Sequence, residues 1–404
     1  YYDYLQLINT GAVMNYAFGD TTKGDYAYES APNSTDLTWE PVITKNIGLD
    51  LGFLNNRLNV SFDAYIRDTK DMLMAGKTLP GVYGASSPRM NVADLRTKGW
   101  EASVTWGDSF TLASKPFNYR IMAGIGDNTS KVTKYDNPNR TLTDPYEGQQ
   151  LGEIWGYVVD GYFKTDEEAR NYKVDQSFVN QMINASALDN GLHAGDLKFV
   201  DLDGNNKIEQ TTSANDRKDM KVIGNSLPRY NYNFGISADW YGIDFSVLFQ
   251  GIGKQNWYPG AETSMFWGPY SRPYASFIPS DFMSQVWSEE NTNAYFPRPR
   301  GYVALGSNRE LAVVNTKYLQ NLAYCRLKNL SIGYTLPDKW LSKIGFEKIR
   351  VYFSGENLLT FTKLHSDYID PEQASASNSW KTSKSDANIY PWAKTYSFGV
   401  DITF

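Results

Sequence analysis

The chain has 404 residues and a net charge of −6, without a basic patch or arm, which argues against nucleic acid as a partner. Aromatic residues reach 15%, dominated by 29 Tyr, which fits girdles at a membrane interface or loops that stack on sugar rings. One Cys excludes an internal disulfide framework, and two His exclude a His-rich metal site. The sequence contains no apolar run long enough for a transmembrane helix. Because Tyr1 lies in an apparently structured run without a signal peptide, we expect residues 1–404 to be part of a longer protein.

Alternation of apolar and polar residues predicts the strands. Side chains of a strand point alternately to its two faces, so each predicted strand has one apolar and one polar face. The last strand shows this clearly, because Tyr396, Phe398 and Val400 share one face while Ser397 and Gly399 share the other. In chain order, we expect strands within residues 1–16, 47–53, 58–66, 99–106, 117–125, 230–240, 243–249, 330–336, 349–353 and 396–404.

The connections between these strands alternate in length. Those after Phe53, Trp106, Trp240 and Leu336 are short, and those at the other strand ends are long. Outer-membrane barrels have short periplasmic turns and long extracellular loops, whereas a soluble sandwich has no physical reason to gather its long loops at one end. The sequence therefore predicts an all-β fold, a transmembrane antiparallel β-barrel. Helix signals at 165–170 and 280–287 predict short helices in the long loops.

The alternation also predicts which side chains face the lumen. Apolar faces should meet lipid, so the acidic residues between them should line the interior. Aromatic residues near the short turns should form the lower girdle, and these are Phe53, Trp106, Phe117, Trp240 and Phe404. The expected lumen-facing acids are Asp50, Asp63, Glu101, Asp239, Asp244 and Asp401.

Several segments resemble one known family. The segment LTWEPVITKNIGLDLGFLNNRLNVSFDAYIRDTKDML at 37–73 is similar to the barrel of SusC/RagA-type TonB-dependent outer-membrane transporters. The same holds, in the family's order, for GDLKFVDLDGNNKIE at 195–209, VIGNSLPRYNYNFG at 222–235, YCRLKNLSIGYTLP at 324–337, GENLLTFTK at 355–363 and YSFGVDITF at 396–404.

This resemblance implies a bacterial outer-membrane protein with a roughly 22-stranded barrel, of which this chain would supply about ten C-terminal strands. It implies an N-terminal plug and a TonB-contacting segment outside these residues. It further implies a SusD-like surface lipoprotein as a lid, a dimer of transporter–lid pairs, and import of oligosaccharides or peptides. Resemblance to outer-membrane proteins that end in alternating aromatic residues with a terminal Phe also implies that the last strand, with Phe404, is an assembly signal.

A short acidic loop suggests calcium. The pattern places oxygen-bearing side chains at positions 1, 3 and 5 and a backbone carbonyl at position 7, as in an EF-hand-like loop. Asn206 stands where such loops have Gly, and Thr212 is a poor closing ligand, so a more distant acid would have to close the site. The predicted Ca2+ ligands are Asp201, Asp203, Asn205, Lys207 and Asp216. The alternative is a metal-free Asx-turn loop.

Aromatic residues cluster in two of the long loops, and they would bind ligand by stacking on sugar rings or peptide side chains. The competing interpretation is anchoring at the upper girdle and packing against a lid. The candidate ligand-binding residues are Trp257, Tyr258, Trp267, Tyr270, Trp380 and Trp392.

Catalysis finds no support in the sequence. Neither His193 nor His365 accompanies a nucleophile motif, so we do not expect an enzyme. Two function classes stay open at this point. One is TonB-dependent import, in which the long loops after residues 133 and 258 contact substrate and lid. The alternative is a self-contained outer-membrane barrel with hydrolase or adhesin activity in its loops.

Overall fold

The computed structural model describes residues 7–12, 25–29, 34, 37–76, 80–83, 87–180, 191–271, 278–299, 304–306, 309–341, 345–374, 384–385 and 390–404. Within them, one antiparallel sheet of nine strands dominates, in the spatial order β18-β16-β15-β12-β11-β6-β5-β4-β3. Its strands are β3 (Val42–Phe53), β4 (Leu58–Ala75), β5 (Arg89–Leu112), β6 (Lys115–Lys134), β11 (Arg229–Trp240), β12 (Ile243–Lys254), β15 (Tyr324–Thr335), β16 (Lys348–Thr362) and β18 (Thr395–Thr403). The antiparallel barrel wall expected from the sequence is confirmed, although the sheet is not closed.

The remaining elements are short and lie almost entirely in the long connections. None of the helices in the described part of the chain is long and apolar enough to cross a membrane. In chain order, these remaining short elements are β1 (Ile8–Ala12), β2 (Asp25–Glu29), η1 (Gly81–Tyr83), β7 (Glu153–Tyr157), β8 (Val159–Tyr162), α1 (Asp166–Arg170), β9 (Leu197–Phe199), β10 (Met220–Asn225), β13 (Asn256–Pro259), α2 (Ser264–Trp267), η2 (Gly268–Tyr270), η3 (Phe282–Gln285), β14 (Gln320–Asn321), α3 (Asp338–Leu341) and β17 (Lys384–Ser385).

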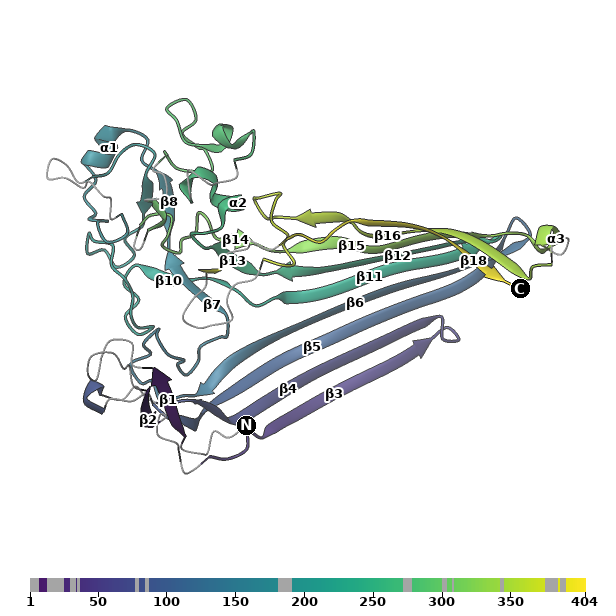
Figure 1. Cartoon of the computed structure of the whole chain (residues 1–404), viewed down its shortest axis with the longest axis horizontal. Coiled ribbons are helices and arrows are strands. Elements are labelled where there is room, and N and C mark those ends of the chain that lie inside the picture. Colours follow the sequence, from purple (N-terminus) through teal and green to yellow (C-terminus); the bar gives the residue numbers. More distant parts are fainter. Residues whose placement is uncertain are drawn as a thin grey trace.

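The tight turns and the C-terminus gather at one end of the sheet, and the long connections fold together at the other (Figure 1). The turn at Asn55 and Asn56 has positive φ at both residues, as expected for Asn. The predicted strand ending at Trp106 continues to Leu112, and the turn is Ala113-Ser114. The strand expected within residues 1–16 is β1, which pairs with β2 in a separate sheet instead of joining the main one.

The strand register places the six predicted lumen acids on one face. Asp63 lies opposite Glu101, Glu101 opposite Gly126, and Gly126 opposite Asn231. Asp239 shares a face with Asn231 and lies opposite Asp244. Arg350, on the same polar face, lies opposite Asp401. Asp50 lies two residues from Gly48, which pairs with Asp63. The polar face is therefore continuous across the sheet.

The opposite face is apolar and exposed over a limited height. On β4 it runs from Leu58 to Ile66, nine residues, which is about the length that spans a bilayer. Beyond it the same face carries Asp68, bound to Arg96 at 2.6 Å, and Lys70, bound to Asp94 at 2.7 Å. These charges mark where the strands leave the lipid.

Aromatic residues border the apolar band at its short-turn end, as predicted. Phe117 packs on Phe110 with ring centroids 5.0 Å apart, and Phe404 packs on Phe346 at 5.3 Å. Tyr241 follows Trp240 in its turn, with ring centroids 6.0 Å apart. Phe110, Tyr241 and Phe346 thus extend the girdle beyond the residues that alternation alone identified.

The long connections form a separate folded layer over the other end of the sheet (Figure 1). Its core is a cluster of buried apolar side chains drawn mainly from the connections β6–β11 and β12–β15. α1 begins where the sequence predicts, because Thr165 Oγ1 accepts a hydrogen bond from the Glu168 N–H. The signal near 280–287 corresponds to the 3-10 helix η3.

Candidate transport pathway and extracellular loops

The polar face of the sheet forms a wall with a shallow hollow of about 370 Å³. Asp63 and Glu101 lie in it beside the amides of Asn231 and Asn233. Gly124 and Gly126 form its base, where an added Cβ would come within 3.3 and 3.1 Å of Asn233 and Glu101. Small residues between carboxylates and amides leave room for water and polar solutes against the wall.

Ion pairs link strands across the polar face near the short turns. The Arg350 guanidinium donates to both carboxylate oxygens of Asp244, at 2.6 and 2.8 Å, and to Asp401 at 3.1 Å. The three residues come from β16, β12 and β18, and Arg350 reaches across β15 to Asp244. The network makes the wall stiff and hydrophilic, which suits a water-filled interior.

A second ionic cluster lies where the wall meets the loop layer. Arg326 of β15 is almost fully buried and donates to Asp370 and Glu372, both at 2.6 Å, and to Thr360 at 3.0 Å. Lys328, which lies in the register shift between Leu327 and Asn329, donates to Glu372 at 2.7 Å. The cluster fastens the connection after β16 to the wall. The sequence analysis did not identify this cluster, since its cations lie 44 to 46 residues from the carboxylates that they bind.

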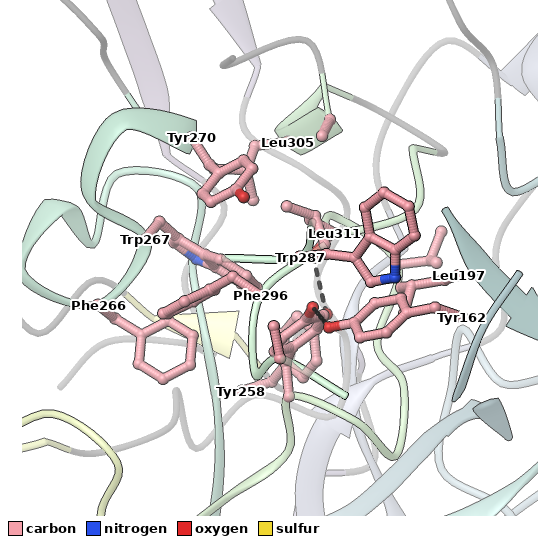
Figure 2. Packing of buried hydrophobic residues seen from close by; sticks show 14 of the residues in the cluster. Tyr162, Leu197, Tyr258, Phe266, Trp267, Tyr270, Trp287, Phe296, Leu305 and Leu311 are labelled. Carbon is pink, nitrogen blue, oxygen red and sulfur yellow. Dashed lines mark hydrogen bonds between the residues drawn. The ribbon is translucent and has the colours of Figure 1, made fainter. Parts of the chain in front are cut away.

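Four predicted ligand-binding residues are interior residues of the loop layer. Trp257, Tyr258 and Trp267 are 0% exposed and Tyr270 is 1% exposed. Figure 2 shows Tyr258, Trp267 and Tyr270 packed with other rings of the cluster. The Trp267 indole N–H donates to the Gly260 carbonyl, and the Tyr270 hydroxyl donates to the Pro297 carbonyl. The expectation that these rings stack on a ligand is corrected, because packing uses their faces; they shape the loop layer instead.

The two remaining aromatic candidates lie elsewhere. Trp392 is 52% exposed, its ring lies 5.7 Å from Lys328 Nζ, and its backbone N–H donates to Asp370 at 3.2 Å. It therefore stands beside the Arg326 cluster with one face open. Trp380 lies outside the described residues.

The acidic loop has the turns that its sequence suggests. Asp201 accepts backbone N–H groups of Gly204 and Asn206, both at 2.7 Å, and Asn206 has φ 62°, which Asn tolerates. Asn205 Oδ1 accepts the Lys207 N–H at 2.8 Å. These bonds fold residues 201–207 into a tight loop at the surface, in which Asp203 and Asn205 are exposed.

The third carboxylate near Asp201 and Asp203 is that of Asp219. One carboxylate oxygen from each of these three residues lies within 4.8 Å of the other two. Asp216, predicted to close the site, is not a member of that group. Asp219 is fully buried and accepts N–H groups of Leu202 and Glu209, and burial raises its pKa above the usual value. Three carboxylates, with amide and carbonyl oxygens of the same loop, fit the preference of Ca2+ for oxygen ligands.

Both histidines make contacts within the loop layer. The His365 ring stacks on Tyr295 with centroids 3.4 Å apart, and its Nε2 lies 2.8 Å from Gln285 Oε1. His193 Nδ1 lies 3.7 Å from Asp166 of α1. These contacts join separate loop segments, so a structural role accounts for both residues.

The exposed apolar band, the aromatic girdle and the polar inner wall define an outer-membrane β-barrel. A sequence model described as "TonB dependent receptor-like, beta-barrel" matches residues 3–358, and the chain belongs to this family. Its relatives include TonB-dependent receptor P3 of Formosa agariphila, 28% identical over 91% of this chain, and TonB-dependent receptor SusC of Bacteroides thetaiotaomicron, 24% identical over 96%.

Solved structures of similar fold include the RagAB peptide importer in the "open-open" state and the RagAB peptide transporter. Both cover 100% of this chain, with TM-scores of 0.68 and 0.67 and identities of 21% and 22%. The chain covers 34% of each of the relatives P3 and SusC and 38% and 39% of these two structures. It therefore spans about a third of the proteins that it matches.

Proposed function

We propose that this chain forms part of the wall and mouth of a transporter that imports a bulky nutrient, an oligosaccharide or a peptide, across the outer membrane. The observation that carries the proposal is the nine-stranded sheet with a continuous polar face and two unpaired edges, β3 and β18, among the described residues. Unpaired backbone groups are costly in lipid, so further strands would have to complete a wider barrel. A wide polar lumen suits a plug and a large solute.

The names of the relatives support energy coupling through TonB, which would act on a plug segment outside these residues. A SusD-like lipoprotein is the lid that we propose, in a dimer of transporter–lid pairs. The loop layer offers it exposed apolar side chains near η3, with Ile278 51% and Met283 69% exposed. The family consists of transporters, so we propose no enzymatic activity.

The test is uptake by cells that make the full-length protein. Fluorescent oligosaccharide and peptide pools should accumulate only when both the protein and TonB are present. Accumulation that is unaffected by loss of TonB would reject the proposal, as would an intact polypeptide of only about 45.7 kDa that forms a closed barrel. The second outcome would favour a self-contained barrel.

The lid is tested separately by purification from the same cells. Met283→Asp should reduce the lipoprotein that copurifies, because it places a charge in the apolar contact. Lys348→Met, at the periplasmic end of β16, is the control and should leave copurification unchanged.

A further inference from the structure

A cavity of about 610 Å³ opens where the connection after β16 crosses the top of the polar wall. Its volume lies in the range of ligand sites in proteins. Arg326 and Thr360 of the wall form one side, and the segment 366–371 forms another. Met265 from α2 and the segment 390–394 complete the lining. The cavity therefore lies at the barrel mouth, between the loop layer and the lumen.

Asp370 fixes the shape of this cavity. Its Oδ1 accepts the Arg326 guanidinium at 2.6 Å and the Glu372 N–H at 2.9 Å, and its Oδ2 accepts the Trp392 N–H at 3.2 Å. One buried carboxylate thus joins the wall to both ends of the connection. On the far side, the Ser366 hydroxyl donates to the Met265 carbonyl at 2.9 Å. These bonds hold the cavity open without a ligand, which lowers the ordering cost of binding.

The lining combines an apolar surface with two opposite charges. Met265, Ile369, Pro371 and Pro391 contribute most of the apolar side, next to the ring of Tyr390. Arg326 and Lys328 together neutralise Asp370 and Glu372. Asp367 and Lys394 also line the cavity, are exposed, and form no ion pair among the described residues. One carboxylate and one ammonium thus remain for a ligand.

We infer that this cavity binds a short peptide with free termini. Asp367 would pair with the peptide ammonium and Lys394 with its carboxylate, while an apolar side chain lies against Met265 and Ile369. A neutral glycan fits less well, because it could accept or donate hydrogen bonds with Asp367 and Lys394 but form no ion pair, and the lining supplies no side-chain amide for its hydroxyls. This inference rests on the proposed import function and specifies its substrate class.

The experiment measures binding to the purified full-length protein by calorimetry. The probes are Ala-Leu-Ala with free termini, its N-acetylated form, its C-amidated form, and maltotriose. Losing one charge-assisted contact should weaken the wild-type protein's binding about tenfold for each capped form. Asp367→Asn should remove the preference for a free N-terminus and keep the preference for a free C-terminus. Lys394→Met should do the reverse.

Matched controls are Asp239→Asn and Lys348→Met, which remove the same charges at the other end of the sheet. They should leave every preference unchanged, and heat-modified gel migration checks that each variant is folded. Equal binding of all peptide forms, no tripeptide binding, or preferences that survive both cavity variants would overturn the inference. Tighter binding of maltotriose, lost in Tyr390→Ala, would assign the cavity to glycans.

Cell uptake separates this inference from the proposed function. TonB-dependent uptake that is unchanged in both cavity variants, Asp367→Asn and Lys394→Met, would reject the peptide site alone. Absence of any TonB-dependent uptake would reject the transporter as well.

Discussion

Side chains along each strand alternate between the two faces of the sheet. Which face a residue occupies is therefore the feature that the sequence predicts best. Asp63 and Glu101 come from different strands, yet their predicted faces agree with the register that places them opposite each other. A shift of one residue would have moved the six lumen-facing acids into lipid. The apolar and polar faces therefore specify one register.

Neighbouring residues Ile236 and Ser237 of β11 test this facing. Ile236→Arg should destabilise the barrel by about 2–4 kcal/mol, because the charge would enter the hydrocarbon core. Ser237→Arg should cost at most about 1 kcal/mol, because it faces the polar lumen, where the like charge of Arg120 opposite it on β6 is the main penalty. Urea unfolding in lipid vesicles measures both. Equal losses of stability would contradict the assignment of the faces.

Arg326 is a second test at the level of one residue. Its side chain is 3% exposed, so Arg326→Met would leave the buried Asp370 carboxylate without its cation, at a cost of about 3–5 kcal/mol, whereas Glu372 would keep Lys328. Hydrogen exchange of residues 364–374 should report this as faster opening. The control Arg57→Met removes an ion pair whose Arg is 52% exposed and should change stability by less than about 1 kcal/mol. Unchanged exchange in Arg326→Met would show that the cluster does not hold the connection.

Elements in the long connections were predicted less completely than the strands. Thr165 with the acids after it identified α1, since a helix cap is a local signal. The burial of Trp257 and Trp267 could not be predicted from the residues around them, because it depends on segments that are far away in the sequence. Arg326 finds its partners through the fold for the same reason, and Asp219 lies beyond the span of the calcium pattern.

The aromatic core of the loop layer makes a direct prediction. Trp267→Ala should destabilise the loop layer by about 3–5 kcal/mol, because it removes a fully buried ring. Trp392→Ala should change stability by about 0.5 kcal/mol or less, since that ring is half exposed. Limited proteolysis of the extracellular side compares the two. If both variants resist proteolysis equally, Trp267 is not needed for packing of the loop layer, and it becomes a candidate ligand-binding residue again.

Calcium binding by the acidic loop stays a prediction. Ca2+ should raise the proteolytic resistance of residues 195–220, and a chelator should reverse this, because binding to the folded loop stabilises it. Asp219→Asn should weaken the effect more than Asp216→Asn, since Asp219 lies with Asp201 and Asp203. Terbium luminescence measures the affinity. Identical responses of the two variants would remove Asp219 from the proposed site.

The whole molecule combines a stiff wall with a folded mouth. The wall is held by strand pairing and lumen ion pairs, while the mouth has its own aromatic core. The two parts meet at the Arg326 cluster, so movement of the mouth can reach the wall through a few named bonds. Large loops of this kind can move as one body instead of as separate segments.

The edges of the sheet give the last prediction. β3 and β18 each pair with one neighbour, so each leaves a row of unpaired N–H and C=O groups at membrane depth. Residues 37–404 produced alone should therefore aggregate or associate edge to edge in detergent. The full-length protein should give a single heat-modifiable barrel, because the further strands that we propose would pair with both edges. Size-exclusion chromatography with light scattering distinguishes these states. A monodisperse, heat-modifiable monomer of residues 37–404 would show that this sheet can close on itself, and the wide barrel would have to be abandoned.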